Sequence, residues 1–257
     1  MVRTLILIVA AALSVASLAP AERKPRVLIY SHTAGFRHDS IPLGKQTLTD
    51  LAVRAGFEPV VSDDAEHFDP AKLREFKVVV FNNTTGELPL SNERRQALLD
   101  FVSAGGGFVG VHAATDTLYE FNGYGVMVGG YFDGHPWNSG DTVTIKNEEP
   151  EHPIAKPWGA APFELTEEIY QFRAPYERSK VRVLLSLDTA KTSLARPGVK
   201  RTDGDFPLAW VRRYGEGRVF YTALGHNEAV WRDERFREHL LAGLQYAASG
   251  GEDAPRK

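Results

Sequence analysis

Residues 105–116, GGGFVGVHAATD, decide how the chain folds, because a short apolar run within them ends abruptly at His112. The helix-like segment 93–103 leads into the three glycines, and the run 108–111 has the character of a buried parallel strand. Ligands of open α/β sheets bind outside the carboxyl ends of such strands, where the strand order reverses. The Gly-x-His-x-Ala spacing around His112 also resembles a Gly-x-nucleophile-x-Gly elbow. The stretch therefore predicts where the active site lies and leaves the reaction open.

Strands and helices alternate from residue 26 to residue 116. The expected strands are 26–30, 57–61, 78–81 and 108–111, and the expected helices are 41–55 and 93–103, with a short helix opening at Asp69-Pro70. Proline near the start of a helix and glycine after its end agree with these bounds. An alternation of this kind predicts a parallel sheet covered by helices on both faces, an α/β fold.

The alternation of strands and helices stops over residues 117–180, where glycine, proline and aromatic residues dominate. This segment predicts an insertion of shorter, partly antiparallel strands and long loops. Two runs joined by a Gly-containing turn then predict an antiparallel hairpin, and a one-faced apolar pattern predicts a last helix. The later strands are expected at 141–146, 181–187, 208–212 and 218–223, and the last helix at 235–247.

Composition places the chain among ordinary globular proteins. Of its 257 residues, 43% are hydrophobic and 25% charged, and the formal net charge is -3. Basic and acidic residues are well mixed, so nucleic acid is not an expected partner. The chain contains no cysteine. This excludes disulfides, thiolate metal ligands and a cysteine nucleophile.

The first 21 residues have the pattern of a signal peptide. Arg3 supplies a positive charge, residues 5–18 form an apolar run, and residues 19–21 (APA) fit a small-x-small cleavage site. We therefore expect a periplasmic or secreted protein with no membrane span in its mature form. The remainder is expected to form one domain over residues 22–250, with a flexible tail at 251–257.

Two strand ends carry histidines suited to acid/base catalysis. His112 stands at the predicted elbow, where Asp116, one helical turn later, could fix its tautomer. His226 follows the strand 218–223, and Glu228 lies two residues further on. His226 and Glu228 could form a base and its orienting group, although a carboxylate there also suits the start of a helix. These four side chains are the predicted catalytic residues.

Amide, hydroxyl, guanidinium and aromatic side chains gather in the same predicted loops. Such a set suits a polyhydroxylated ligand better than an apolar one, because each hydroxyl needs a hydrogen-bond partner and sugar rings stack on aromatic faces. Core packing explains the aromatic residues about equally well. The predicted substrate-binding residues are Arg37, His38, Asn83, Thr84, Tyr131, His135 and Tyr170.

Eight histidines in a chain without cysteine raise the question of a metal. Imidazole and carboxylate ligands suit zinc, manganese or iron. However, no His-Glu-x-x-His motif or other ligand spacing is present. We therefore expect no cofactor, and metal-dependent hydrolysis remains an alternative.

Several ordered motifs resemble the trehalose-utilisation (ThuA-like) family over residues 26–248. They are 34–41 (AGFRHDSI), 105–116, 130–132 (GYF) with His135-Pro136, His152-Pro153, 168–170 (EIY) and 221–226 (YTALGH). The resemblance implies a flavodoxin-like fold similar to class I glutamine amidotransferases, with a mostly parallel sheet. In those enzymes the elbow holds a cysteine and a later His-x-Glu completes the triad. Here His112 takes the cysteine's position, so covalent acyl transfer from glutamine is not available.

The resemblance also implies a role in disaccharide catabolism, in which a partner dehydrogenase makes 3-keto-sugars. The expected ligand is a small carbohydrate, either a trehalose-like glycoside or its 3-keto form. A ketone at C3 acidifies the C2 proton, so an imidazole base could start elimination or isomerisation. The expected enzyme is therefore a sugar-processing hydrolase, lyase or isomerase. A non-catalytic carbohydrate-binding protein is the second interpretation.

Overall fold

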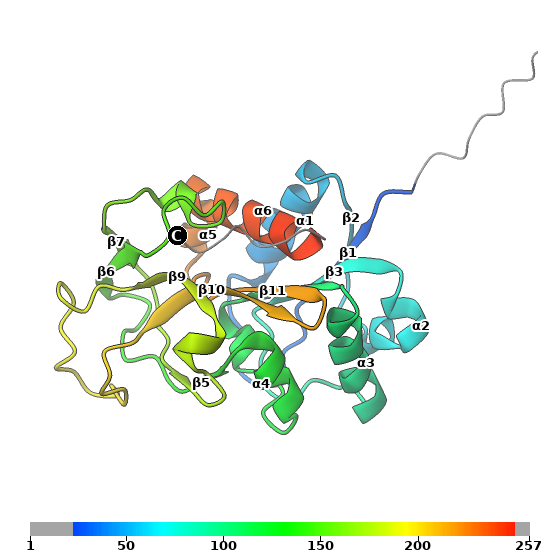
Figure 1. The fold of residues 1–257 in the computed structure, drawn as a ribbon, viewed down its shortest axis with the longest axis horizontal. Coiled ribbons are helices and arrows are strands. Elements are labelled where there is room, and N and C mark those ends of the chain that lie inside the picture. The colour runs from blue at the N-terminus through cyan, green and yellow to red at the C-terminus, as the bar shows by residue number, and fades with distance from the viewer. Residues whose placement is uncertain (1–22, 250–257) are drawn as a thin grey trace, which may run out of the picture.

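A mixed nine-stranded sheet forms the centre of the structure, a computed structural model that describes residues 23–249 (Figure 1). The strand order is β2-β1-β3-β4-β11-β10-β9-β6-β7. The strands are β1 (Arg26–Tyr30), β2 (Glu58–Val61), β3 (Phe76–Asn82), β4 (Gly107–Val111), β6 (Thr142–Asn147), β7 (Phe163–Thr166), β9 (Arg182–Leu187), β10 (Pro207–Tyr214) and β11 (Gly217–Thr222). A separate pair joins β5 (Tyr131–Phe132) to β8 (Phe172–Arg173).

Five neighbouring strands, from β2 to β11, run parallel and have the flavodoxin-like order. Val27–Tyr30 and Val78–Phe81 are fully buried, as the apolar runs predict for strands covered on both faces. Asn82 on β3 and Thr222 on β11 both pair with Val111 on β4. The three strands therefore end level, and the residues that follow them emerge side by side.

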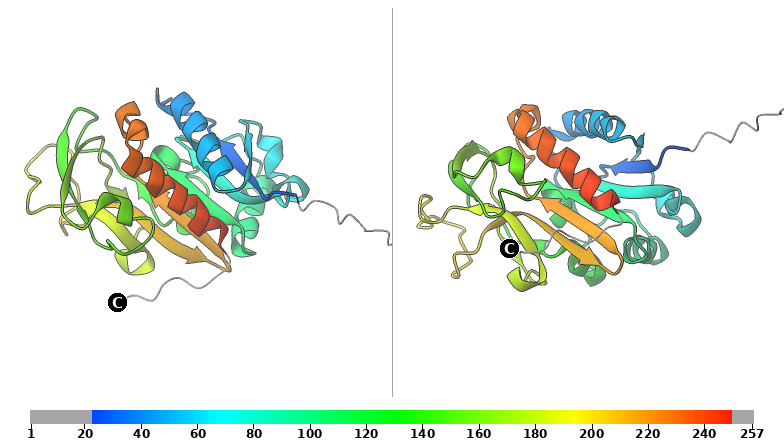
Figure 2. Two further views of the ribbon diagram at one scale, coloured as in Figure 1. Left: turned by 90° about the horizontal axis from the view of Figure 1, so that it is seen from above. Right: turned by 45° about the horizontal axis from the view of Figure 1, so that its top comes forward.

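Helices cover both faces of the parallel half. The helices α1 (Ile41–Arg54) and α6 (Glu234–Ala248) lie side by side on one face, and α3 (Asn92–Ser103) and α4 (Asn122–Val128) lie on the other (Figure 2). Two shorter helices are α2 (Pro70–Leu73) and α5 (Glu228–Arg232). The α/β prediction is confirmed, with element bounds that differ by one or two residues.

The segment after α4 extends the sheet instead of forming a separate layer. The strands β6 and β7 pair antiparallel with each other, and β6 continues the sheet through β9. The antiparallel hairpin of β10 and β11 is also confirmed, and it joins this antiparallel half to the parallel half. The loops of the insertion consequently lie close to the carboxyl ends of β4 and β11.

The predicted signal peptide at 1–21 and the tail at 251–257 fall outside the described residues. Among residues 23–249, none of the helices combines the length and the apolar character needed to cross a membrane.

Candidate active site

Four side chains from distant parts of the sequence converge at the carboxyl ends of the parallel strands. His38 follows β1, His112 follows β4, and His226 follows β11, whereas Glu168 comes from the segment between β7 and β8. Potential ligand atoms of all four lie within 4.8 Å of one another. We call this group the histidine cluster. It lies at the sheet edge where ligands of doubly wound folds bind.

The elbow after β4 places His112 at the centre of this cluster. Its φ angle is 49°, a left-handed conformation that non-glycine residues rarely adopt, and the residue stands at the predicted elbow. Its side chain is fully buried, and Nδ1 lies 2.7 Å from the carbonyl oxygen of Ala223. A carbonyl oxygen only accepts, so Nδ1 donates and Nε2 of the neutral ring presents its lone pair to the cluster.

Three polar groups surround Nε2 of His112. The Tyr170 hydroxyl lies 2.9 Å from it, Nδ1 of His226 lies 3.3 Å away, and Oε2 of Glu168 lies 3.3 Å away. The same carboxylate oxygen is 3.2 Å from Nδ1 of His226. His112 and His226 are thus in direct contact, and both also contact Glu168. Their proximity depends on the pairing of β4 with β11.

The electrostatics of the cluster favour a negative Glu168. Burial opposes its ionisation, but the imidazoles of His112 and His226 outweigh this effect and hold the pKa of Glu168 far below its ordinary value. Burial likewise opposes charge on His226, yet the hydrogen bond to Glu168 raises the pKa of His226. His38 shows the opposite behaviour, since burial, followed by the neighbouring imidazoles, lowers its pKa to about 3.

A second buried carboxylate, Glu167, fixes the loop that carries His226. Its oxygens accept backbone N–H groups from Gly225 at 2.8 Å, from His226, and from Asn227 at 3.0 Å. Burial raises the pKa of Glu167, and the backbone hydrogen bonds act against that rise. Glu167 thus holds the His226 loop in place, whereas Glu168, the next residue in the sequence, faces the cluster.

Two contacts expected from the sequence are made by other residues. Asp116 accepts a 2.6 Å hydrogen bond from the Tyr119 hydroxyl, and the Ala223 carbonyl takes the orienting position at His112. Glu228 pairs with Arg232 at 2.8 Å on the exposed start of α5, and Glu168 is the carboxylate beside His226. The expectation that Asp116 orients His112 and Glu228 orients His226 therefore needs correction.

The predicted substrate-binding residues divide into buried and accessible groups. Asn83 and Thr84 are fully buried: the Asn83 amide lies 3.4 Å from Ser40, and the Thr84 hydroxyl bonds Thr117. The hydroxyl of Tyr131 binds backbone groups near α4. These three residues shape the loops. By contrast, His38 and Tyr170 belong to or contact the cluster, and Arg37 and His135 are exposed.

His135 connects the cluster with the exposed surface. The His135 side chain is 42% exposed, and its Nδ1 lies 3.3 Å from Oε1 of Glu168. Phe36 is 64% exposed and contacts the His38 ring edge-on, with 4.8 Å between ring centroids. An exposed aromatic ring and an exposed imidazole thus flank the buried cluster.

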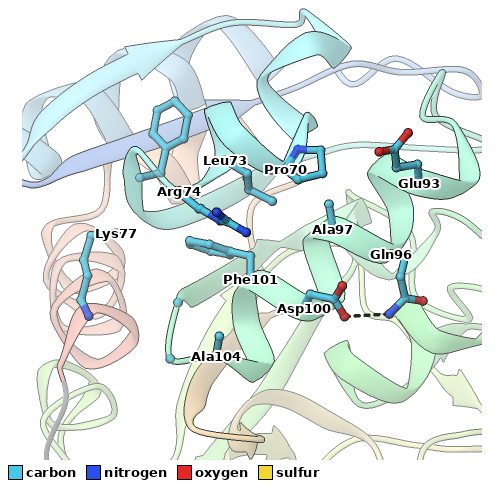
Figure 3. Close-up of a pocket in the computed structure, with 13 residues that line it drawn as sticks. Pro70, Leu73, Arg74, Lys77, Glu93, Gln96, Ala97, Asp100, Phe101 and Ala104 are labelled. Atoms are coloured by element: carbon cyan, nitrogen blue, oxygen red, sulfur yellow. Dashed lines mark hydrogen bonds between the residues drawn. The ribbon is translucent and has the colours of Figure 1, made fainter.

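A cavity of about 570 Å³ lies elsewhere, between α2 and α3 (Figure 3). Its lining includes Arg74, Phe101 and Asp100, which accepts a 2.9 Å hydrogen bond from Gln96. It also includes residues 104–106 immediately before β4, so it lies at the amino ends of the strands. It is therefore at the opposite edge of the sheet from the histidine cluster.

Sequence reasoning missed Glu168 as a site residue. The residue appeared only within the motif 168–170 that contributed to the family resemblance. The local signal was a pair of carboxylates followed directly by the large side chains of Ile169 and Tyr170. Such a pattern indicates that a carboxylate is buried, and a buried charge requires a partner.

Comparison with known proteins agrees with this resemblance. The family model described as "ThuA: Trehalose utilisation" matches residues 26–247. No curated protein matches the chain.

Solved structures of two ThuA-like proteins are similar over nearly their whole length. One from Bacteroides uniformis has 26% sequence identity and a TM-score of 0.70, covering 90% of this chain and 95% of that one. One from Parabacteroides merdae has 19% identity and a TM-score of 0.63, covering 91% and 94%. A β-galactosidase from Bacillus circulans shares the fold alone, at 12% identity and a TM-score of 0.54, over 87% of this chain and 30% of that one.

Proposed function

The chain belongs to the trehalose-utilisation family, and from this premise we propose that it processes a trehalose-like glycoside or its 3-keto derivative at the histidine cluster. The observation that carries this proposal is the convergence of His38, His112, Glu168 and His226 at the ligand-binding edge of the sheet. Three imidazoles beside one carboxylate form a site for proton transfer and for stabilising an oxyanion.

A 3-keto-sugar suits this arrangement because its reaction needs only a base and a group that stabilises negative charge. The base removes the C2 proton, the electron pair forms the C2–C3 double bond, and the carbonyl oxygen gains the charge. The double bond then moves as the bond between C1 and the glycosidic oxygen breaks, and the leaving oxygen takes a proton. The elimination consumes no oxidant or reductant.

The exposed and buried parts of the site divide these roles. His135 reaches solvent and contacts Glu168, so it is placed to exchange a proton with the substrate. The buried cluster beneath it faces the position of the developing enolate oxygen, where low exposure to water strengthens electrostatic stabilisation.

Ordinary glycoside hydrolysis fits this site less well. That reaction uses two carboxyl groups on either side of the glycosidic bond. Here Glu168 is held between imidazoles, and the oxygens of Glu167 accept backbone N–H groups. Neither carboxylate is arranged as a nucleophile with an opposing acid.

The cellular setting follows from the same proposal. A protein with the signal-like pattern at 1–21 would work outside the cytoplasm on sugars that a dehydrogenase has oxidised at C3. The dehydrogenase is the partner that such a pathway requires.

The experiment is ¹H NMR of 3-keto-trehalose and plain trehalose in D₂O with the mature chain. We expect loss of the C2 proton signal and product formation from the keto-sugar alone. His135→Gln should slow this reaction by about 100-fold or more, the range of a lost acid/base group. His112→Ala should abolish it, and His32→Gln, a histidine in the loop after β1 but outside the cluster, should not.

Two outcomes would contradict the proposed elimination from a 3-keto-sugar. Equal conversion of both sugars would show that the ketone is not needed. Binding of either sugar without conversion would favour a carbohydrate-binding protein.

A further inference from the structure

We propose that the histidine cluster binds one divalent transition-metal ion of the zinc, manganese or iron class, with His38, His112, Glu168 and His226 as its protein ligands. The binding of the ion is argued from the geometry of these four side chains. Only the role of the ion in sugar chemistry rests on the proposed function.

The separations between donor atoms match the size of such an ion. Zinc–nitrogen bonds are about 2.0–2.1 Å long, so two ligand atoms of a tetrahedral site lie about 3.3–3.4 Å apart. Nε2 of His112, Nδ1 of His226 and Oε2 of Glu168 form a triangle with sides of 3.3, 3.3 and 3.2 Å. Two imidazoles and a carboxylate on one triangular face are also a known ligand set for iron(II).

The orientation of His112 supports a role as a metal ligand. Metal-binding histidines usually donate their other ring N–H to a carbonyl or carboxylate, which fixes the tautomer and directs the free nitrogen. His112 donates Nδ1–H to Ala223 at 2.7 Å, and its Nε2 points into the cluster, where a bound ion would replace the 2.9 Å hydrogen bond from the Tyr170 hydroxyl. The positive φ at this residue holds the side chain in that position.

His38 supplies an independent observation. The residue is 5% exposed, and its Nδ1 is buried without a hydrogen-bond partner in the described part of the chain. An unpaired polar atom at this depth costs free energy unless something binds it. One ring nitrogen of His38 lies within 4.8 Å of the potential ligand atoms of the other three residues, so an ion bound to those residues would be within reach of the His38 imidazole.

Protons bound to the ring nitrogens satisfy the lone pairs of this cluster less completely than a metal ion does. A proton shared between two ring nitrogens serves one pair at a time, and adding protons to three neighbouring imidazoles creates repulsion between like charges. A divalent ion accepts lone pairs from three neutral rings and neutralises the carboxylate of Glu168 as well. The donor set is therefore better suited to a metal ion than to a hydrogen-bond network.

The accessible side of the cluster indicates what the ion would do. The His226 side chain is 22% exposed and contacts Glu168, which also contacts the exposed His135, whereas the His112 side chain is fully buried. A substrate oxygen arriving from that side would meet the ion, which would polarise a carbonyl group as a Lewis acid. His135 would remain available for proton transfer.

The test is metal binding by the mature chain after treatment with a chelator and removal of that chelator. Calorimetry with Zn²⁺ should give one ion per chain, and Co²⁺ should give visible absorption bands typical of nitrogen and oxygen ligands. Glu168→Gln, His38→Gln and His226→Gln should each weaken Zn²⁺ binding by about 100-fold or more, beyond the usual effect of residues outside the ligand set. His226 is partly exposed, so His226→Gln is the variant expected to fold best.

His32→Gln is the matched control and should bind Zn²⁺ like the unaltered chain. Stoichiometry near zero in the unaltered chain would overturn the inference. Equal Zn²⁺ affinity of His226→Gln and His32→Gln, both shown to be folded by circular dichroism, would also overturn it.

The two proposals fail in different ways. One bound ion without conversion of 3-keto-trehalose would preserve the metal site and reject the proposed function. Conversion of the keto-sugar by a chain that binds no Zn²⁺ or Co²⁺ would preserve the function and reject the metal site.

Discussion

Two buried histidines, His112 and His239, both contact a backbone carbonyl oxygen through Nδ1. The surroundings of their Nε2 atoms differ. Both are fully buried, and each places Nδ1 within 2.8 Å of a backbone carbonyl oxygen, that of Ala223 or of Ile154. Nε2 of His112 faces a hydroxyl, an imidazole and a carboxylate. Nε2 of His239, on α6, has no hydrogen-bond partner among the described residues and is surrounded by the rings of Trp158, Phe220 and Phe236.

Burial and a carbonyl contact therefore do not by themselves mark a functional histidine. The aromatic shell around His239 offers no charge, so burial lowers the pKa of its imidazole to about 4 and keeps the ring neutral. The cluster around His112 contains a carboxylate and a solvent-facing side. The region of His239 depends on apolar packing, whereas the region of His112 depends on polar contacts. Each region can therefore be weakened separately.

The largest expected effect comes from Glu167, which holds the His226 loop through backbone hydrogen bonds. Glu167→Gln replaces one acceptor oxygen with an amino group that points at backbone N–H donors. Because hydrogen bonds to buried charged groups contribute about 1.5–3 kcal/mol each, we expect the free energy of unfolding to fall by about 3 kcal/mol. Urea denaturation measures this loss, and conversion of the keto-sugar should fall with it because His226 moves.

Glu164→Gln is the matched control, since it makes the same chemical change at an exposed position on β7. It should alter the free energy of unfolding by less than about 0.5 kcal/mol. If the two variants proved equally stable, the polar contacts of Glu167 would not hold the loop.

A smaller effect is expected from pH in the region of His239. The pKa of this imidazole is about 4 in the folded chain and 6.5 in the unfolded chain, so between these pH values the unfolded chain binds a proton that the folded chain does not. The stability contribution of neutral His239 is complete above pH 6.5 and is lost as pH falls toward 4. Linkage predicts a loss of about 2 kcal/mol between pH 7 and pH 5.

Denaturation of His239→Leu over the same pH range isolates this contribution. Other titrating groups, including His152, which lowers the pKa of His239, are present in both proteins and cancel in the difference. The variant should lose about 2 kcal/mol less than the unaltered chain between pH 7 and pH 5. Parallel pH curves would show that His239 is not kept neutral by burial.

The fold could be predicted from sequence because its signals are local. Alternating apolar runs and amphipathic segments identified the strands of the parallel half and their helices. Ser91, which precedes the predicted helix 93–103, is the N-cap of α3 and accepts the Arg94 amide at 3.3 Å. The turn before Arg218 identified the β10–β11 hairpin. The edge strand β7 was not assigned a range from the sequence, since it lies in a segment rich in glycine and proline, whereas β6 was predicted to within one residue.

The site could be predicted only in part, because its contacts join residues far apart in the chain. The end of a predicted strand and the elbow-like spacing were enough to single out His112. His226 and Glu228 are close in sequence, but Asn227 is the N-cap of α5, and Glu228 at the first position of this helix pairs with Arg232 at the surface. Glu168 reaches His112 across 56 positions, and no periodic pattern encodes that contact.

The smallest expected effect concerns Phe36, which distinguishes the open site from the closed shell around His239. Its ring is 64% exposed beside His38, and the Thr85 hydroxyl fixes its backbone by donating to the Phe36 carbonyl at 2.8 Å. A rigid aromatic face at the entrance would stack on a sugar ring for about 1 kcal/mol, so Phe36→Ala should raise KM for the keto-sugar about 5-fold with kcat unchanged. Val53→Ala, an exposed apolar change on α1, should leave both constants unaltered. A fall in kcat with constant KM would instead place Phe36 among the groups that position His38, and the entrance would then lie on the His135 side alone.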